Sequence, residues 1–191
     1  GDQWNEPRDY SRCVTIAEVL QRAGYRTMMA GKWQGRDLPF QRGFHRSFGP
    51  ESLSMISYFH EVQGNAFYRD GQRWQPPDDF FMTDAISDHA VEFVAEAGGD
   101  KRPFFLYVAY IAPHWPLHAR EGDVQPHRER YRQDGWDYWH RWRFARQREM
   151  ELITPEWRLR PRPAGIGDWA NDPHKDWQAE RMAVYAAQVV N

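Results

Sequence analysis

Three side chains have the chemistry to hold an oxyanion. Lys32 is a compact positive charge with three hydrogen-bond donors, and Gly31 and Gly35 flank its segment, letting the backbone approach a ligand closely. If the backbone stays extended, Gln34 points to the same side as Lys32, because side chains alternate along a strand. His114 carries two ring nitrogens that can donate to an ester or sulfate oxygen. These residues predict an oxyanion site.

Lys32 and His114 also have ordinary structural interpretations. An isolated lysine is more often a solvated surface residue. His114 lies beside an aromatic residue and two prolines, Pro113-His114-Trp115-Pro116, so its ring is expected to pack in a turn. A metal site of His114 with His118 is disfavoured, because Pro116 interrupts the helix that this spacing requires. The residue types alone leave the two interpretations open.

The segment before each candidate residue reads as a helix followed by a strand. The capping box Thr15-Ile16-Ala17-Glu18 begins an apolar helical stripe, and residues 25–30 read as a short strand that leads to Lys32. Residues 83–97 carry a second apolar helical face. The nearly unbroken apolar run at 104–111 is typical of a strand buried on both faces.

This alternation predicts an α/β fold with a mainly parallel sheet flanked by helices. In open parallel sheets, ligands bind beyond the carboxyl ends of the strands. Lys32, Gln34 and His114 all follow predicted strands. We therefore expect the fold to bring their loops together.

The remaining segments are less regular. Residues 36–80 and 117–135 are expected to form loops, residues 136–152 a helix rich in Trp and Arg, and residues 153–175 an extended segment with several prolines. The stretch from Arg128 to Arg148 contains seven arginines interleaved with aromatic residues, a pattern that suits single-stranded nucleic acid. The alternative is an amphipathic helix with outward arginines, which the net charge of the whole chain favours.

Composition limits the classes of partner. The 191 residues include 25 Lys and Arg against 27 Asp and Glu, a formal charge of −2, so no global attraction to nucleic acid or anionic membrane is expected. No apolar run approaches the roughly 20 residues that span a bilayer. Cys13 is the only cysteine, which excludes an intrachain disulfide, and it is expected to be a small buried residue rather than a nucleophile.

The two ends of the sequence predict an internal fragment. The chain begins with Gly1 without a signal-peptide pattern. It ends at Asn191, within a helical periodicity formed by Met182, Tyr185, Ala186 and Val189 and without a stop signal. A short terminal helix is the alternative.

Several motifs, in order, resemble the sulfatase family. Residues 24–33, Gly-Tyr-Arg-Thr-Met-Met-Ala-Gly-Lys-Trp, resemble the second sulfatase signature, and the helix at 15–20 and the Arg-Gly-Phe turn at 42–44 flank it as in that family. Residues 103–117 are similar to the family's buried strand and histidine loop. Segments near 144–147 and 182–187 resemble arylsulfatase helices. The resemblance runs from about Cys13 to the end of the chain.

The resemblance implies an alkaline-phosphatase-like fold and hydrolysis of a small-molecule or carbohydrate sulfate ester. It implies a formylglycine nucleophile, made from a Cys/Ser-x-Pro-x-Arg motif, and a Ca²⁺ ion held by carboxylates and an amide. Lys32 matches the lysine that contacts the sulfate, and His114 the proposed proton donor to the leaving group. Such enzymes are often periplasmic, extracellular or lysosomal.

Two departures from the family pattern matter. Gln34 stands where a histidine beside the formylglycine is usual, and an amide cannot exchange a proton near neutral pH. Cys13 does not match the modified residue, because Thr15 and Ala17 stand in place of its Pro and Arg. We therefore expect the nucleophile and first metal ligands before Gly1, the later Asp-Asn ligands after Asn191, and no activity from this segment alone. A phosphodiesterase or phosphonate monoester hydrolase of the same superfamily, and a pseudoenzyme that binds sulfated ligands, remain the alternatives.

Overall fold

The computed structural model describes residues 9–50, 57–59 and 66–191, which form two compact units divided after Pro116. The first unit is a sheet with helices, and the second is helical. None of the described helices is both long and apolar enough to cross a membrane.

In chain order the first unit contains α1 (Ile16–Arg22), β1 (Arg26–Gly31), the 3-10 helix η1 (Pro39–Arg42), β2 (Arg46–Pro50), β3 (Phe67–Arg69), β4 (Gln72–Trp74), α2 (Met82–Gly98) and β5 (Phe104–Ala109). The second contains α3 (Glu121–Glu149), the 3-10 helix η2 (Trp169–Asn171) and α4 (Lys175–Val190).

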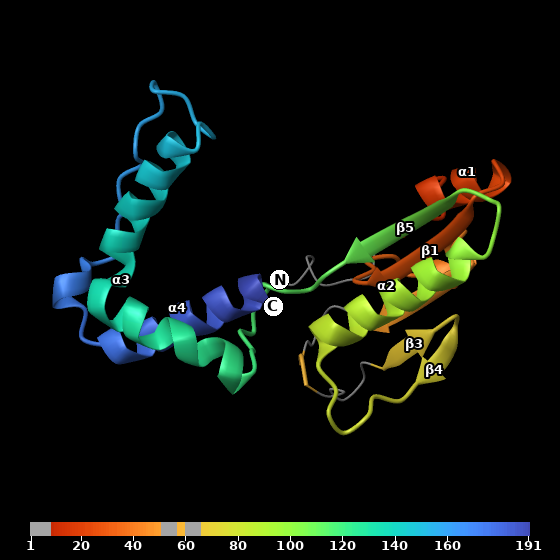
Figure 1. Cartoon of the computed structure of the whole chain (residues 1–191), viewed down its shortest axis with the longest axis horizontal. Helices are drawn as coiled ribbons and strands as arrows, with labels where there is room; N and C mark the ends of the chain where they lie inside the picture. Colours follow the sequence, from red (N-terminus) through yellow and green to blue (C-terminus); the bar gives the residue numbers. More distant parts are fainter. Residues whose placement is uncertain (1–8, 51–56, 60–65) are drawn as a thin grey trace. The chain divides into compact units, whose positions relative to one another are not determined.

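The five strands form one mixed sheet in the order β4-β3-β2-β1-β5 (Figure 1). β1 is parallel to both of its neighbours, β2 and β5. β3 and β4 form an antiparallel hairpin that extends the sheet beyond β2. The predicted α/β class is confirmed, and the strands that precede Lys32 and His114 belong to its parallel part.

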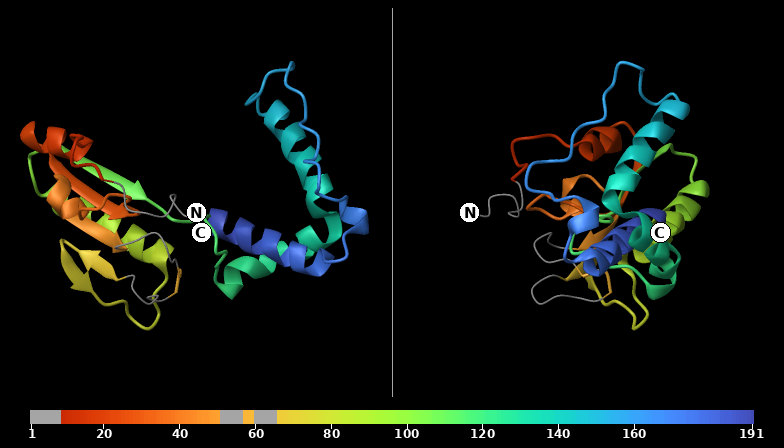
Figure 2. Two further views of the ribbon diagram at one scale, coloured as in Figure 1. Left: turned by 180° about the vertical axis from the view of Figure 1, so that it is seen from behind. Right: turned by 90° about the vertical axis from the view of Figure 1, so that its left-hand side faces the viewer.

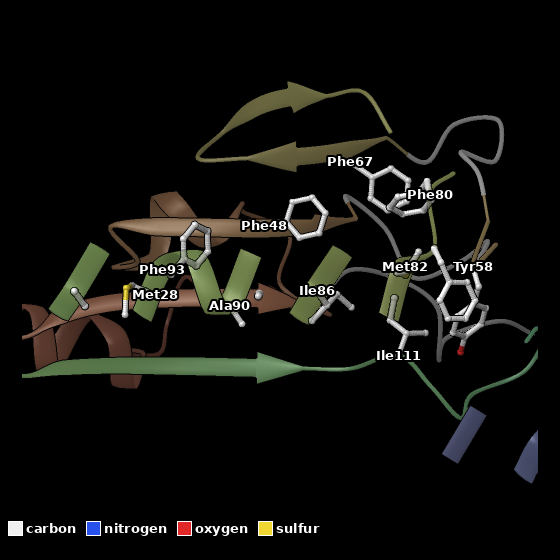
Figure 3. Packing of buried hydrophobic residues seen from close by; sticks show 13 residues of the cluster. Met28, Phe48, Tyr58, Phe67, Phe80, Met82, Ile86, Ala90, Phe93 and Ile111 are labelled. Carbon is white, nitrogen blue, oxygen red and sulfur yellow. The ribbon is translucent and has the colours of Figure 1, made fainter. Parts of the chain in front are cut away.

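The helices α1 and α2 cover opposite faces of the sheet, as the alternation of side chains along β1 requires. Met28 and Ala30 face the larger core, which also includes Phe48 and Phe93 (Figure 3). Met29 points the other way, into a smaller cluster with Ala17 of α1. The predicted capping box is present, since Thr15 and Glu18 bond each other's backbone N–H groups.

The strand β5 differs from its prediction. Its residues are not buried on both faces, and Phe104 is 46% and Tyr107 44% exposed. In the described part of the sheet, β5 is an edge strand with β1 on one side only. An apolar run therefore identified the strand correctly but not its burial.

The helix α3 also differs, because it begins at Glu121 within the segment 117–135 that was expected to be a loop. It kinks at Gly135, which has φ 60° and ψ −176°. A Cβ at Gly135 would lie 2.1 Å from the ring of Trp169, so only glycine lets this ring pack against the kink. The predicted helix at 136–152 is the second half of α3.

The helices α3 and α4 form the core of the second unit through Val124, Ala183 and Ala187. Arg128 on α3 joins them by binding Glu180 of α4 at 2.7 Å. The predicted apolar face of α4 is rotated, since Tyr185 and Val189 are exposed and small alanines face α3 instead. Small residues let the two helix backbones approach closely.

Candidate functional site

The backbone of Lys32 is fixed by the parallel pairing of β1 and β5. Gly31, the last residue of β1, pairs with Ala109, and the N–H of Lys32 donates to the Ala109 carbonyl at 2.7 Å. Gly31 has φ 112°, and a Cβ there would lie 2.1 Å from the same carbonyl oxygen. Only glycine fits this close approach. The backbone of the half-buried Lys32 is therefore held at a defined position, directly beyond the carboxyl end of β1.

Trp33 anchors the loop that carries Lys32 and Gln34. Its indole N–H donates to the carbonyl of Asp37 at 2.7 Å, and its ring meets Phe44 edge-on at 5.9 Å. The ring thus packs in the cluster on the α1 face of the sheet. The side chain of Gln34 is exposed, where it is accessible to a ligand.

His114 lies five residues beyond β5 in a loop held by backbone hydrogen bonds. Its N–H donates to the Ile111 carbonyl at 3.0 Å, and its own carbonyl accepts from the hydroxyl of the buried Tyr58 at 2.9 Å. The peptide bonds before Pro113 and Pro116 are both cis. The loop is therefore positioned by the sheet and by the core around Tyr58.

The hydrogen bonding of the His114 ring defines its tautomer. The Nδ1 atom lies 2.6 Å from the carbonyl oxygen of Trp115, which can only accept, so Nδ1 carries a proton. The ring also stacks on Trp115, with centroids 6.0 Å apart, as the structural interpretation predicted. Among the described residues Nε2 has no hydrogen-bond partner, and the side chain is exposed. Nε2 is thus the nitrogen available to a ligand.

The structure brings the Lys32 and His114 segments to one edge of the sheet. β1 and β5 are adjacent and parallel, so both chains leave the sheet at their carboxyl ends. Figure 3 shows both strands running toward Tyr58 and Ile111. This placement is the one that the sequence predicted for an oxyanion site, and the roles of the three side chains remain predictions.

Two residues that shape the site were not identified from the sequence as site residues. Tyr58 lies in a segment that was expected to be irregular, and nothing in its local pattern indicates a contact with His114, 56 positions away. Gly31 was noted as a flanking glycine, but its close contact with β5 depends on strand pairing. The need for a glycine with positive φ at the end of β1 could have been predicted only from the pairing register of β1 and β5.

Other candidate features of the sequence give no site. Cys13 is exposed, contrary to the expectation of a buried residue, because it precedes α1 in a turn that is held through its backbone, whose N–H donates to Tyr10 and whose carbonyl accepts from Arg42. In the described part of the chain, no three His, Cys, Asp or Glu side chains gather where they would hold a metal ion. These residues therefore do not form the calcium site that the resemblance implies.

The chain is similar to known sulfatases. A family model described as Sulfatase matches residues 4–189. An arylsulfatase of Klebsiella aerogenes is 31% identical over the whole chain, and an uncharacterized sulfatase of Schizosaccharomyces pombe is 30% identical over 93% of it. The chain spans 43% and 35% of the lengths of these two relatives.

A solved structure has a related fold. The crystal structure of Ps i-CgsB in complex with k-i-k-neocarrahexaose matches with a TM-score of 0.54 and 28% identity, over 66% of this chain and 32% of that one. The family match covers almost every residue, and both relatives match at 30% identity or more. The chain belongs to the sulfatase family.

Proposed function

We propose that this chain supplies the sulfate-binding and proton-donating side chains of a sulfuric ester hydrolase of the arylsulfatase type. One observation carries the proposal, the hydrogen bond that ties the Lys32 backbone to Ala109 at the end of β5. It holds the Lys32 and His114 segments on adjacent parallel strands at the edge where such sheets bind ligands.

Lys32 supplies positive charge to the sulfate group. Its ammonium group approaches a non-bridging oxygen and stabilises the negative charge that develops in the transition state. Because Trp33 is held against the α1 face, an extended path through this loop turns Lys32 and Gln34 to the opposite side together. Gln34 then donates its amide N–H to a second oxygen.

His114 supplies the proton for the leaving group. As the S–O bond to the alcohol breaks, negative charge collects on the ester oxygen, and Nε2–H of a protonated ring donates its proton there. The carbonyl of Trp115 accepts from Nδ1–H in both charge states and so orients the ring. The hydrogen bond from Tyr58 fixes the loop on the other side of the residue.

The substrate is proposed to be a small-molecule or carbohydrate sulfate ester. The related Ps i-CgsB structure contains a neocarrahexaose, which supports a carbohydrate. The nucleophile motif Cys/Ser-x-Pro-x-Arg and the Asp-Asn calcium ligands are proposed to lie in flanking sequence, so the described residues act without a calcium role of their own. Sequencing the flanking DNA tests whether these motifs are present there. A start codon immediately before Gly1, together with a stop codon after Asn191, would refute the proposal.

Leaving-group dependence tests the role of His114. In the protein that includes the flanking sequence, Lys32→Ala should reduce kcat/KM about 10²- to 10³-fold for every sulfate ester, since it removes a transition-state donor. His114→Ala should reduce it about 10²-fold or more for an alkyl sulfate and much less for nitrophenyl sulfate, whose leaving group needs no proton. Equal losses on both esters would contradict the acid role.

Two rival functions have distinct outcomes in the same assay. Sulfate and phosphate esters share a tetrahedral shape, so a bis-aryl phosphate cleaved faster than an aryl sulfate would favour the phosphodiesterase. Retained binding without turnover would favour the pseudoenzyme suggested by Gln34. A Gln34→His variant should gain sulfatase turnover because it restores a group that exchanges protons, and no gain would contradict this account of position 34.

A further inference from the structure

The second half of α3 and the segment that returns beside it concentrate positive charge. Residues 138–163 contain seven arginines and three glutamates, whereas the whole chain has a formal charge of −2. The other residues of the chain are therefore net acidic. We call this region the arginine seam, and its arginines are Arg141, Arg143, Arg146, Arg148, Arg158, Arg160 and Arg162.

Two sets of side-chain contacts, which we call the clasps, fix the return segment, residues 155–162, to the second half of α3. At one end Arg148 donates to the carbonyls of Pro155, at 2.6 Å, and Trp157, at 3.2 Å. At the other end Arg162 binds Asp137 at 2.6 Å. Between these points the segment returns in the direction opposite to the second half of α3, alongside the helix in the left view of Figure 2 and set apart from it in the right view.

Arg158 and Arg160 lie between the clasps. Both are exposed, and neither has an ion-pair partner within the part of the chain that the structure describes. Arg141 is on the helix face that the clasps use, because residues 137, 141 and 148 fall on one side of an α-helix. It is likewise exposed, and no described carboxylate forms an ion pair with it. The clasped arginines thus build the seam. Arg158 and Arg160 present charge without an ion-pair partner among the described residues, and Arg141 adds exposed charge near Asp137, whose pKa it helps to lower.

The seam also presents an aromatic surface. Trp157 is 62% exposed and precedes Arg158 directly, while its carbonyl is held by Arg148. An exposed indole offers an apolar face to the C–H side of a sugar ring. Adjacent guanidinium groups match the oxygens of sulfate groups with paired N–H donors.

We propose that the arginine seam binds a sulfated polysaccharide chain, separately from the single sulfate ester that is cleaved. This rests on the proposed function, which makes sulfate the anion that the protein encounters on its substrates. The seven arginines outnumber the three glutamates of the seam, so their positive charges are only partly compensated, and a polyanion relieves the remaining repulsion. The seam would thus select polymeric substrates over small aryl sulfates.

Binding of the 191-residue chain to fluorescently labelled dextran sulfate tests the proposal, with uncharged dextran and a thymidine dodecamer as comparisons. The variant Arg158→Gln/Arg160→Gln should weaken dextran sulfate binding about fivefold or more, as expected from two exposed charge contacts. The matched control Arg12→Gln/Arg22→Gln removes two exposed arginines elsewhere and should change binding less than twofold. Raising the salt concentration should weaken binding further.

Equal effects of the two variants, equal binding of uncharged dextran, or tighter binding of the thymidine dodecamer would each overturn the proposal. If the double variant unfolds, Arg141→Gln replaces it as a single substitution on the regular helix, with Arg22→Gln as control. Failure of the proposed function has a different signature, which is read in the protein that includes the flanking sequence: there, no sulfate ester would be turned over, whether or not the seam is substituted. Failure of the seam alone would leave turnover intact and dextran sulfate binding insensitive to its arginines.

Discussion

Gly31 fixes where the site begins. Its positive φ and its contact with the Ala109 carbonyl let β1 end against β5, so that the next residue, Lys32, is held by a backbone hydrogen bond. Gly24 is a useful comparison, because it also has positive φ, at 85°, but its Cβ would meet no atom within 4 Å. Substitutions at the two glycines therefore allow the cost of a left-handed backbone to be measured separately from the cost of a steric clash.

We expect Gly31→Ala to destabilise the chain far more than Gly24→Ala. At Gly24 the cost is the left-handed conformation alone, about 1 kcal/mol. At Gly31 the strands must also move apart, which should raise the loss in free energy of unfolding to about 3 kcal/mol or more. Urea unfolding of both variants measures this, and equal losses would show that the close approach to Ala109 does not matter.

Tyr58 is expected to position His114 through a single hydrogen bond. Tyr58→Phe keeps the ring in the core but removes the hydroxyl that donates to the His114 carbonyl. The free energy of unfolding should fall by about 1 kcal/mol. In the protein with its flanking sequence, kcat should fall for alkyl sulfates more than for nitrophenyl sulfate, following His114. A loss of stability with no such difference would make Tyr58 purely structural.

At the level of single residues, the sequence indicated which side chains could bind an oxyanion but not the contacts that hold them in position. Lys32, Gln34 and His114 stand out by type and by their place after predicted strands. Neither the bond from Tyr58 nor the tautomer of His114 has a local signature, because both depend on contacts formed in the fold.

At the level of elements, Arg46 joins the sheet to α2. On β2 it binds Asp70 at 2.8 Å and also binds Glu96 of α2, while its guanidinium lies 4.7 Å from the ring centroid of Phe93. The side chain is 19% exposed. Hydrogen bonds from Arg46 hold the pKa of Glu96 below its ordinary value. This ion pair is therefore shielded from solvent more than a surface pair is.

We expect Arg46→Met to lower the free energy of unfolding by about 1–3 kcal/mol, since it removes one charged partner from each of two partly buried carboxylates, while Glu96 keeps its ion pair with Arg26. The control Arg102→Met removes an exposed pair with Asp100, in which Arg102 is 52% exposed, and should cost less than about 0.5 kcal/mol. Chemical unfolding of the two variants compares them. A larger loss in the Arg102 variant would contradict this ranking.

His89 makes the contact between α2 and β2 sensitive to pH. Its ring stacks on Phe48 at 3.6 Å and donates from Nδ1 to the Ala85 carbonyl. Burial lowers the pKa of His89, with a further lowering from Arg69. The unfolded chain then binds protons below about pH 6.5 that the folded chain does not, so stability should fall as pH decreases.

We expect the free energy of unfolding to drop by up to about 1 kcal/mol between pH 7.5 and 5.5, above the range where carboxylates titrate. His89→Asn keeps an N–H donor but removes the titration, so this drop should shrink. The remaining part is assigned to His45, whose pKa is also lowered by burial. An unchanged pH dependence in His89→Asn, with His174→Asn as an exposed control, would contradict the assignment.

Long periodic elements could be predicted, and short or interrupted ones could not. The apolar faces of α2 and the strands β1 and β5 follow clear patterns. β3 and β4 have three residues each and no apolar run, so the pairing of β3 with β2 and of β4 with β3 is set by the hairpin rather than by periodicity. The first half of α3 was missed because Pro126 and Gly135 are typical of loops, yet the helix continues past one and kinks at the other.

At the level of the whole molecule, the two units divide the proposed work. The sheet unit carries Lys32, Gln34 and His114 after its parallel strands, and the helical unit carries the arginine seam. The net charge of −2 favoured an amphipathic helix with outward arginines over a polyanion-binding region, because charge averaged over the chain says nothing of its distribution. Family membership came from motifs in order along the sequence, and the comparisons confirm it.

The central claim is that Lys32 and His114 bind one sulfate group. A crystal structure of the protein with its flanking sequence and a bound sulfate ester tests this most directly. We predict that Lys32 Nζ and His114 Nε2 both lie within hydrogen-bond distance of oxygens on the same sulfate group. A sulfate group held away from either residue, or the two side chains on opposite sides of the sheet, would contradict the account.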